Sequence, residues 1–200
     1  INEISVGITT LIFNYIMIKT FSTEGVAAFA VINYLLWIGI MISFGISDSL
    51  QPIISKNFGA KENKRIEEFL KIAFISTYIV GFFMIALIIL VPEQLANLFL
   101  EDTNYETKQI VLNFVTFIWI AFLFNGANLI VSAYFTAIHK PLHSAIIAIS
   151  RSFIFPVLFI FILPMIFEKN GIFLVIPIAE FVTFIIAIVL FKNFSPRKIV

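Results

Sequence analysis

Four residues near the start of the sequence have the types and the spacing of an ion-binding site. Glu3, Gly7, Thr10 and Asn14 are separated by four, three and four positions, so they fall in one narrow stripe of a helix. Oxygen ligands that end in a carboxylate suit a Na⁺ ion, and the carboxylate alone can bind a proton. The stripe predicts a cation-coupling site at Glu3, Thr10 and Asn14. The alternative is that Glu3 lies among lipid headgroups while Thr10 and Asn14 bond to a neighbouring helix.

Glu180 is a second candidate carboxylate, placed deep in an apolar segment. It lies nine residues beyond Gly171, where that segment starts. An ionised side chain at the middle of a bilayer costs about 2.5 to 3.5 kcal/mol on insertion scales, so Glu180 must be protonated or face a polar group. Arg151 lies at a similar depth in the preceding segment. We therefore predict a structural ion pair between them, with contact between Glu180 and a coupling ion or substrate as the alternative.

Asparagine residues supply the other polar side chains inside the apolar segments. Asn125, Asn128 and Ser132 are spaced i, i+3 and i+7, which puts them on one helix face. Such a face either bonds to a neighbouring helix or lines a cavity. We assign Asn125 and Asn128 to a substrate cavity together with Asn33 and Glu180. The asparagines, Asn14 included, are expected on one broad face of the bundle that is more polar than its lipid-facing sides.

The composition excludes several other kinds of function. The sequence contains no nucleophile with a base beside it and no glycine-rich phosphate loop, so nothing supports an enzyme. A net charge of +1 is too small to indicate a nucleic-acid partner. The absence of cysteine removes disulfides and thiolate metal sites. No cofactor is expected, and no metal beyond a Na⁺ ion at Glu3, with H⁺ as the other candidate coupling ion.

Six long apolar segments must position these side chains. Of the 200 residues 60% are hydrophobic and only 12% are charged, a balance typical of a chain surrounded by lipid. Each segment can cross about 30 Å of hydrocarbon as a helix, and each is too long and too continuously apolar to be a barrel strand. The predicted fold class is an all-α membrane protein, a six-transmembrane-helix bundle that forms a single lobe over residues 1–200. The segments are residues 4–21, 26–55, 66–91, 110–138, 142–167 and 171–191.

Basic residues predict the orientation of this bundle. One side of the membrane collects ten of them, whereas the other keeps Lys19, Lys108 and Lys169. The ten are Lys56, Lys61, Lys64, Arg65, Lys71, Lys140, Arg151, Lys192, Arg197 and Lys198. Because cytoplasmic loops carry an excess of Lys and Arg, we expect a multi-pass protein of the cytoplasmic (inner) membrane with a cytoplasmic C-terminus.

Two connections have recognisable features. Gly59 and Ala60 are expected to make the turn after the second segment, with Gly59 as a left-handed helix terminator because it has no Cβ. On the opposite side, Pro92 precedes Leu95 and two further apolar residues at helical spacing. This pattern predicts a short helix in the membrane interface.

Several parts of the sequence resemble one transporter family. The run from Gly45 to Ile66, GISDSLQPIISKNFGAKENKRI, resembles the signature that follows the second helix of each half in the multidrug and toxic compound extrusion (MATE) family. We assign structural roles to Gln51, Pro52 and Gly59 in this run, and also to Arg151. Residues 92–102 look like its outer interfacial segment, and residues 150–180 look like its last two helices. Residues 2–8 are similar to the start of the seventh helix, so the chain is expected to be the C-terminal half of a longer protein.

This resemblance implies a twelve-helix antiporter in which two six-helix lobes face each other across a central cavity. The implied function is export of organic cations or amphiphilic drugs, coupled to Na⁺ or H⁺. The implied partners are the lipid bilayer, an N-terminal six-helix lobe and a small organic cation. Glu3 matches the acidic residue of the family's seventh helix, whereas Asn125 and Asn128 stand where its tenth helix often carries an acid. A flippase for lipid-linked saccharides and a membrane scaffold without transport remain alternatives.

Overall fold

The computed structural model describes residues 2–100 and 105–198, with side chains from Ile4 onward. All regular structure in these ranges is helical. The α-helices are α1 (Asn2–Gly59), α2 (Asn63–Leu90), α3 (Pro92–Asn97), α4 (Tyr105–Ile118), α5 (Phe122–Ala137), α6 (Pro141–Ile149), α7 (Phe155–Phe167) and α8 (Asn170–Asn193). Short 3₁₀ segments occupy Trp119–Ala121 and Pro196–Lys198, and a π-helical turn occupies Ser150–Ile154.

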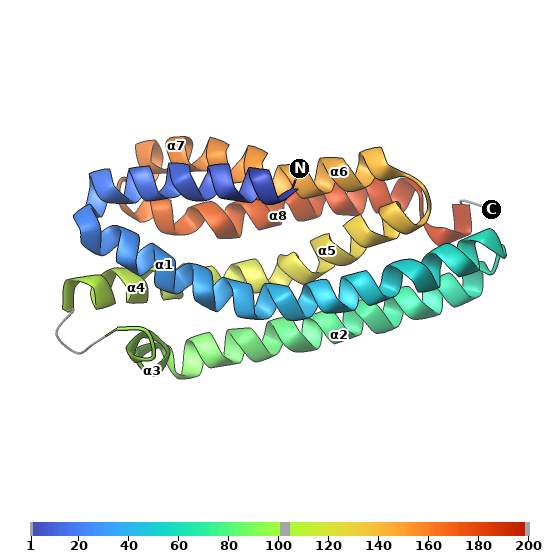
Figure 1. Cartoon of the computed structure of the whole chain (residues 1–200), viewed down its shortest axis with the longest axis horizontal. Helices are drawn as coiled ribbons and strands as arrows, with labels where there is room; N and C mark the ends of the chain where they lie inside the picture. The colour runs from blue at the N-terminus through green and yellow to red at the C-terminus, as the bar shows by residue number, and fades with distance from the viewer. Residues whose placement is uncertain (1, 101–104, 199–200) are drawn as a thin grey trace.

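Helix α1 consists of two membrane-length helices joined at Ser22. Ser22 has φ 57° and ψ −151°, which no helical residue adopts, and the chain reverses there. Figure 1 shows the first part of α1 running to one end of the bundle and the second part returning beneath it. The described residues contain five continuous stretches long and apolar enough to cross a membrane, and the first of these is the bent α1. The predicted all-helical bundle of six crossing segments is therefore confirmed.

The fifth crossing, α6 to α7, contains the π-helical turn, and Pro156 accounts for it. Proline has no N–H, so the carbonyl four residues earlier, on Ser152, loses its usual helical donor. In this structure Thr9 of α1 replaces that donor, because its Oγ1 donates to Ser152 O at 2.7 Å. The irregular turn is thereby attached to the first helix.

We expect Thr9→Val to destabilise the protein by about 1 kcal/mol, the size of an interhelical hydrogen bond in a membrane. Thr10→Val is the matched control, since Thr10 Oγ1 donates only to Val6 O of its own helix, at 2.9 Å. Thermal unfolding in detergent compares the two variants. Equal losses would show that the bond between Thr9 and Ser152 contributes nothing specific.

The interior of the bundle is packed with large apolar side chains. Phe13, Phe29, Phe114 and Phe173 are fully or almost fully buried and form a connected set of ring contacts with centroids 4.6 to 6.3 Å apart. A second buried cluster surrounds Tyr134 and includes Ile54 of α1 and Ile66 of α2, so it lies nearer the end of the bundle that carries the α1–α2 turn. Apolar side chains also cover the outside, where residues such as Ile79, Phe82, Phe83 and Met165 are 60% exposed or more. An apolar exterior of this kind is suited to lipid.

Helices α7 and α8 approach so closely that only glycine fits at Gly171. A Cβ at this position would overlap the carbonyl group of Leu163 and the nitrogen of Pro164. We expect Gly171→Ala to cost about 1 to 3 kcal/mol, the usual range for overpacking. Gly45→Ala is the control because nothing lies within 4 Å of its Cβ position. Chemical unfolding should separate the two variants, and an unaffected Gly171→Ala would contradict the packing described here.

The turn between α1 and α2 lies where it was predicted, but its left-handed residue is different. Helix α1 ends at Gly59 and α2 begins at Asn63. Lys61, with φ 60°, is the left-handed residue, and Gly59 keeps a negative φ, so its assignment as the terminator was wrong. The amides of Lys61 and Glu62 donate to the carbonyls of Phe58 and Asn57, the two hydrogen bonds of a Schellman cap.

The connections form two groups at opposite ends of the bundle. Figure 1 shows the α1–α2 turn, the α5–α6 turn and the C-terminal segment together at one end, as expected for the basic side. Arg151 was counted with that side, but its side chain is buried within the bundle. At the opposite end α3 is the predicted short helix, with Pro92 in its first turn.

Candidate functional site

Glu180 is the centre of a buried polar cluster. Asn125 and Asn128, one helical turn apart on α5, point at α8. Asn125 Nδ2 donates to Glu180 Oε1 at 2.8 Å, and Asn128 Nδ2 donates to Oε2 at 2.8 Å. Asn128 Nδ2 also approaches the Glu180 carbonyl oxygen at 3.0 Å. Each carboxylate oxygen therefore has an amide donor, which fixes the position of the group.

Arg151 balances the charge of this carboxylate. Its Nη1 lies 3.5 Å from Glu180 Oε1, and the two side chains are only 10% and 8% exposed. The ion pair predicted from their depths in the sequence is therefore present. The guanidinium also lies 5.7 Å from the ring centroid of Phe44, within the range of a cation–π contact. Arg151 sits on the π-helical turn, which places it between α1 and α8.

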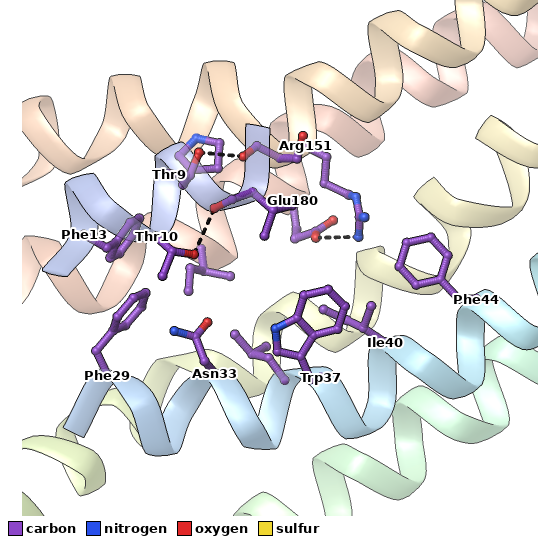
Figure 2. Close-up of a pocket in the computed structure, with 15 residues that line it drawn as sticks. Thr9, Thr10, Phe13, Phe29, Asn33, Trp37, Ile40, Phe44, Arg151 and Glu180 are labelled. Carbon is purple, nitrogen blue, oxygen red and sulfur yellow. Dashed lines mark hydrogen bonds and ion pairs between the residues drawn. The ribbon is translucent and has the colours of Figure 1, made fainter. Parts of the chain in front are cut away.

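A pocket of about 130 Å³ opens beside the ion pair. Figure 2 shows both parts of α1 lining it, with Thr9 and Thr10 on the first part and Asn33 on the second. Arg151 and Glu180 lie across from them. The rest of the wall is mainly aromatic and aliphatic: Val6, Phe13, Phe29, Leu36, Trp37, Ile40, Phe44, Ser152, Pro156 and Ile176. The pocket thus combines two charged groups with an apolar wall suited to an organic molecule.

Two buried polar atoms near the pocket have no hydrogen-bond partner among the described residues. They are Asn128 Oδ1, behind the carboxylate, and Ser152 Oγ, next to Arg151. Buried polar atoms normally find a partner, and of these two residues Ser152 lines the pocket, where a polar ligand atom or a water molecule could bond to its hydroxyl.

The residues predicted for the substrate cavity occupy two layers. Asn33 and Glu180 line the pocket, whereas Asn125 and Asn128 lie behind Glu180 as its donors. Asn14 is half-buried on α1 and is not among the lining residues. Of the four asparagines, Asn33 is therefore the one that lines the pocket.

The predicted coupling stripe is described only in part. Thr10 lines the pocket, and its hydroxyl bonds to its own helix. The side chain of Glu3 lies outside the described residues. No cluster of three or more potential metal ligands occurs among the residues that the structure does describe. The Na⁺ site thus stays a prediction.

The other three residues with an assigned structural role lie near the basic end. Gln51 Nε2 donates to Asp48 Oδ1 at 3.3 Å, and Pro52 and Gly59 are both within α1. None of them lines the pocket.

Sequence reasoning missed Thr9, Ser152 and the aromatic wall. Ser152 carried a usable signal, because it stands four residues before Pro156 and so has a freed carbonyl. Trp37 and Phe44 carried none, since aromatic residues are frequent throughout the chain and only the fold selects those that line the pocket.

Comparison with known proteins identifies one matching sequence family and several structures of similar fold. A sequence model of the MatE family matches residues 1–162. A search of curated protein sequences returned no match.

Three solved structures illustrate the likeness of fold. A MOP superfamily transporter from Pyrococcus furiosus Vc1, whose binding pocket of reverse polarity suggests a different function, matches with a TM-score of 0.89 and 19% identity. A MATE in complex with MaL6 matches with a TM-score of 0.90 and 19% sequence identity. The outward-facing conformation of a multidrug resistance MATE family transporter of the MOP superfamily matches with a TM-score of 0.89 and 19% sequence identity. Each match covers 98% of this chain and 45% of the other, so the chain spans less than half the length of these transporters.

Proposed function

Because the chain belongs to the MatE family, we propose that its bundle is one lobe of an antiporter that exports organic cations or amphiphilic drugs in exchange for Na⁺ or H⁺. The members of this family are transporters. In this proposal a second six-helix lobe faces the bundle across the transport path. The protein would lie in the cytoplasmic membrane with its basic end inside the cell.

The observation that carries the proposal is the charged pocket inside an apolar, lipid-facing bundle. Ionisable groups within membrane segments are costly and usually mark transport pathways or binding sites. Arg151 and Glu180 both line the pocket, and the polar residues Thr10 and Asn33 line it with them. Aromatic residues supply the remaining contacts for an amphiphile. A scaffold without transport would need helix-bonding polar groups but not a pocket.

We assign ion coupling to Glu3 rather than to Glu180. The Glu180 carboxylate already has a guanidinium and two amide donors, so it needs neither a proton nor Na⁺ to offset its charge. Glu3 belongs to the same helical stripe as Thr10, which lines the pocket. Binding of a cation at Glu3 would therefore act on the helix that forms one wall of the pocket.

The flippase alternative receives less support from the pocket. An anionic lipid-linked head group calls for several basic side chains. Among the described residues that line the pocket Arg151 is the basic one, and Glu180 balances its charge.

Transport into liposomes tests the proposal. The full chain is reconstituted, and movement of two fluorescent amphiphiles, cationic ethidium and zwitterionic rhodamine B, is followed under imposed Na⁺ and pH gradients. We expect at least one gradient to drive at least one dye, with the effect lost when an ionophore dissipates that gradient. Dye movement equal to that of protein-free liposomes under both gradients would contradict the proposal.

A further inference from the structure

The pocket contains one fixed positive and one fixed negative charge. Among the described residues that line it, Arg151 and Glu180 are the charged ones, and their charges cancel. A guanidinium does not lose its proton in a protein, so Arg151 stays positive whatever enters. A ligand therefore meets a pocket that is neutral in total but strongly polarised.

Charge balance decides which ligands such a pocket can hold. A ligand with one net positive charge would leave that charge uncompensated in surroundings of low dielectric constant, which is costly. The same holds for a net anion. A zwitterion keeps the total at zero, because its anionic group pairs with Arg151 while its cationic group pairs with Glu180.

The ion pair is built so that a ligand can enter it. Its separation of 3.5 Å between Nη1 and Oε1 exceeds the roughly 2.7 to 2.9 Å of a charge-assisted hydrogen bond. Asn125 and Asn128 hold the carboxylate independently, so it keeps two donors when Arg151 moves. Within the described part of the chain no hydrogen bond is found for the Arg151 guanidinium, and Ser152 Oγ, on another residue that lines the pocket, has no partner. These free donors suit a carboxylate.

We propose that the pocket binds a small zwitterion, with an ammonium and a carboxylate on one apolar body, between Arg151 and Glu180. The proposal rests on the proposed export function and, of the organic cations and amphiphilic drugs named there, selects zwitterionic amphiphiles. Phe13, Phe29 and Trp37 would receive the apolar body. The volume of about 130 Å³ is close to that of a cavity of about 150 Å³ that holds benzene, so a single ring fits.

Three ligands that share a phenyl ring and differ in charge test the proposal. They are phenylalanine, a zwitterion, phenethylamine, a cation, and 3-phenylpropanoate, an anion. Their dissociation constants are measured by calorimetry on the full chain in an uncharged detergent. We expect phenylalanine to bind about tenfold more tightly than either of the others, because only it leaves no buried charge unpaired.

Substitution of each charge should change the preferred ligand. Arg151→Met leaves Glu180 alone, so phenethylamine should become the tightest ligand. Glu180→Gln leaves Arg151 alone, so 3-phenylpropanoate should become the tightest. The double variant should bind all three equally weakly. Arg197→Met is the matched control, since Arg197 pairs with Glu67 at 2.7 Å on the exposed surface and should leave the order unchanged.

The proposal is overturned if wild-type protein binds phenethylamine as tightly as phenylalanine, or binds none of the three. It is also overturned if the double variant keeps the wild-type order, a test that does not need either single variant to fold. The liposome assay is independent of this ranking. Gradient-driven dye transport without a zwitterion preference would refute the inference alone, whereas the preference without gradient-driven transport would refute the proposed function alone.

Discussion

Glu180→Gln should destabilise the protein by about 3 to 5 kcal/mol, because it leaves the buried Arg151 guanidinium without a counter-charge. Arg151→Met should cost less, since the Glu180 carboxylate still accepts hydrogen bonds from two amides. The double variant removes both charges and should recover most of the loss. Thermal unfolding of the purified full chain measures all three variants.

One outcome of this thermodynamic cycle would contradict a stabilising interaction between Arg151 and Glu180. If the losses of the two single variants simply add in the double variant, the two side chains do not interact energetically. Glu180 would then be a carboxylate deep in the membrane without a structural counter-charge, and the coupling role would move from Glu3 to Glu180.

Glu3→Gln should abolish the gradient-driven part of transport while leaving folding and membrane insertion unchanged. The amide keeps the shape of the side chain but can neither bind a proton nor offer a charge to Na⁺. Flux in liposomes with and without a gradient measures the effect. Glu24→Gln is the matched control, because Glu24 lies beside the break at Ser22 and accepts a hydrogen bond from Thr23 there. Full gradient dependence in the Glu3 variant would place the coupling site elsewhere.

Most of the fold was predictable because lipid imposes a simple rule on the sequence. A crossing helix needs about 20 apolar residues, so the six segments and the break between Phe21 and Val26 could be read directly. Local departures were less visible. The π-helical turn lies just before Pro156. Proline alone, however, does not determine whether a helix kinks, bulges or continues. Similarly, Gly59 is the residue type most often found as a left-handed helix terminator. In the structure α1 continues through Gly59, and Lys61, two residues later, has the positive φ.

The candidate site was predictable in its charges but not in its surroundings. Depth along two neighbouring segments was enough to pair Arg151 with Glu180, and helical spacing put Asn125 and Asn128 on one face. That this face points at Glu180 depends on how α5 rotates against α8, which spacing within one helix does not determine. The apolar lining depends in the same way on the packing of α1 against the other helices.

Cysteine labelling at Asn33 tests most directly the claim that this pocket belongs to the transport path. The chain has no cysteine of its own, so Asn33→Cys provides a single thiol in the pocket, and Phe83→Cys provides one on the lipid-facing surface. In liposomes a hydrophilic maleimide should label the Asn33 variant but not the Phe83 variant. Labelling at Asn33 should slow when phenylalanine, whose single ring the pocket can hold, is added and should change when the gradient of the coupling ion is reversed. Labelling at Asn33 no faster than at Phe83, or unaffected by both phenylalanine and the gradient, would contradict the account.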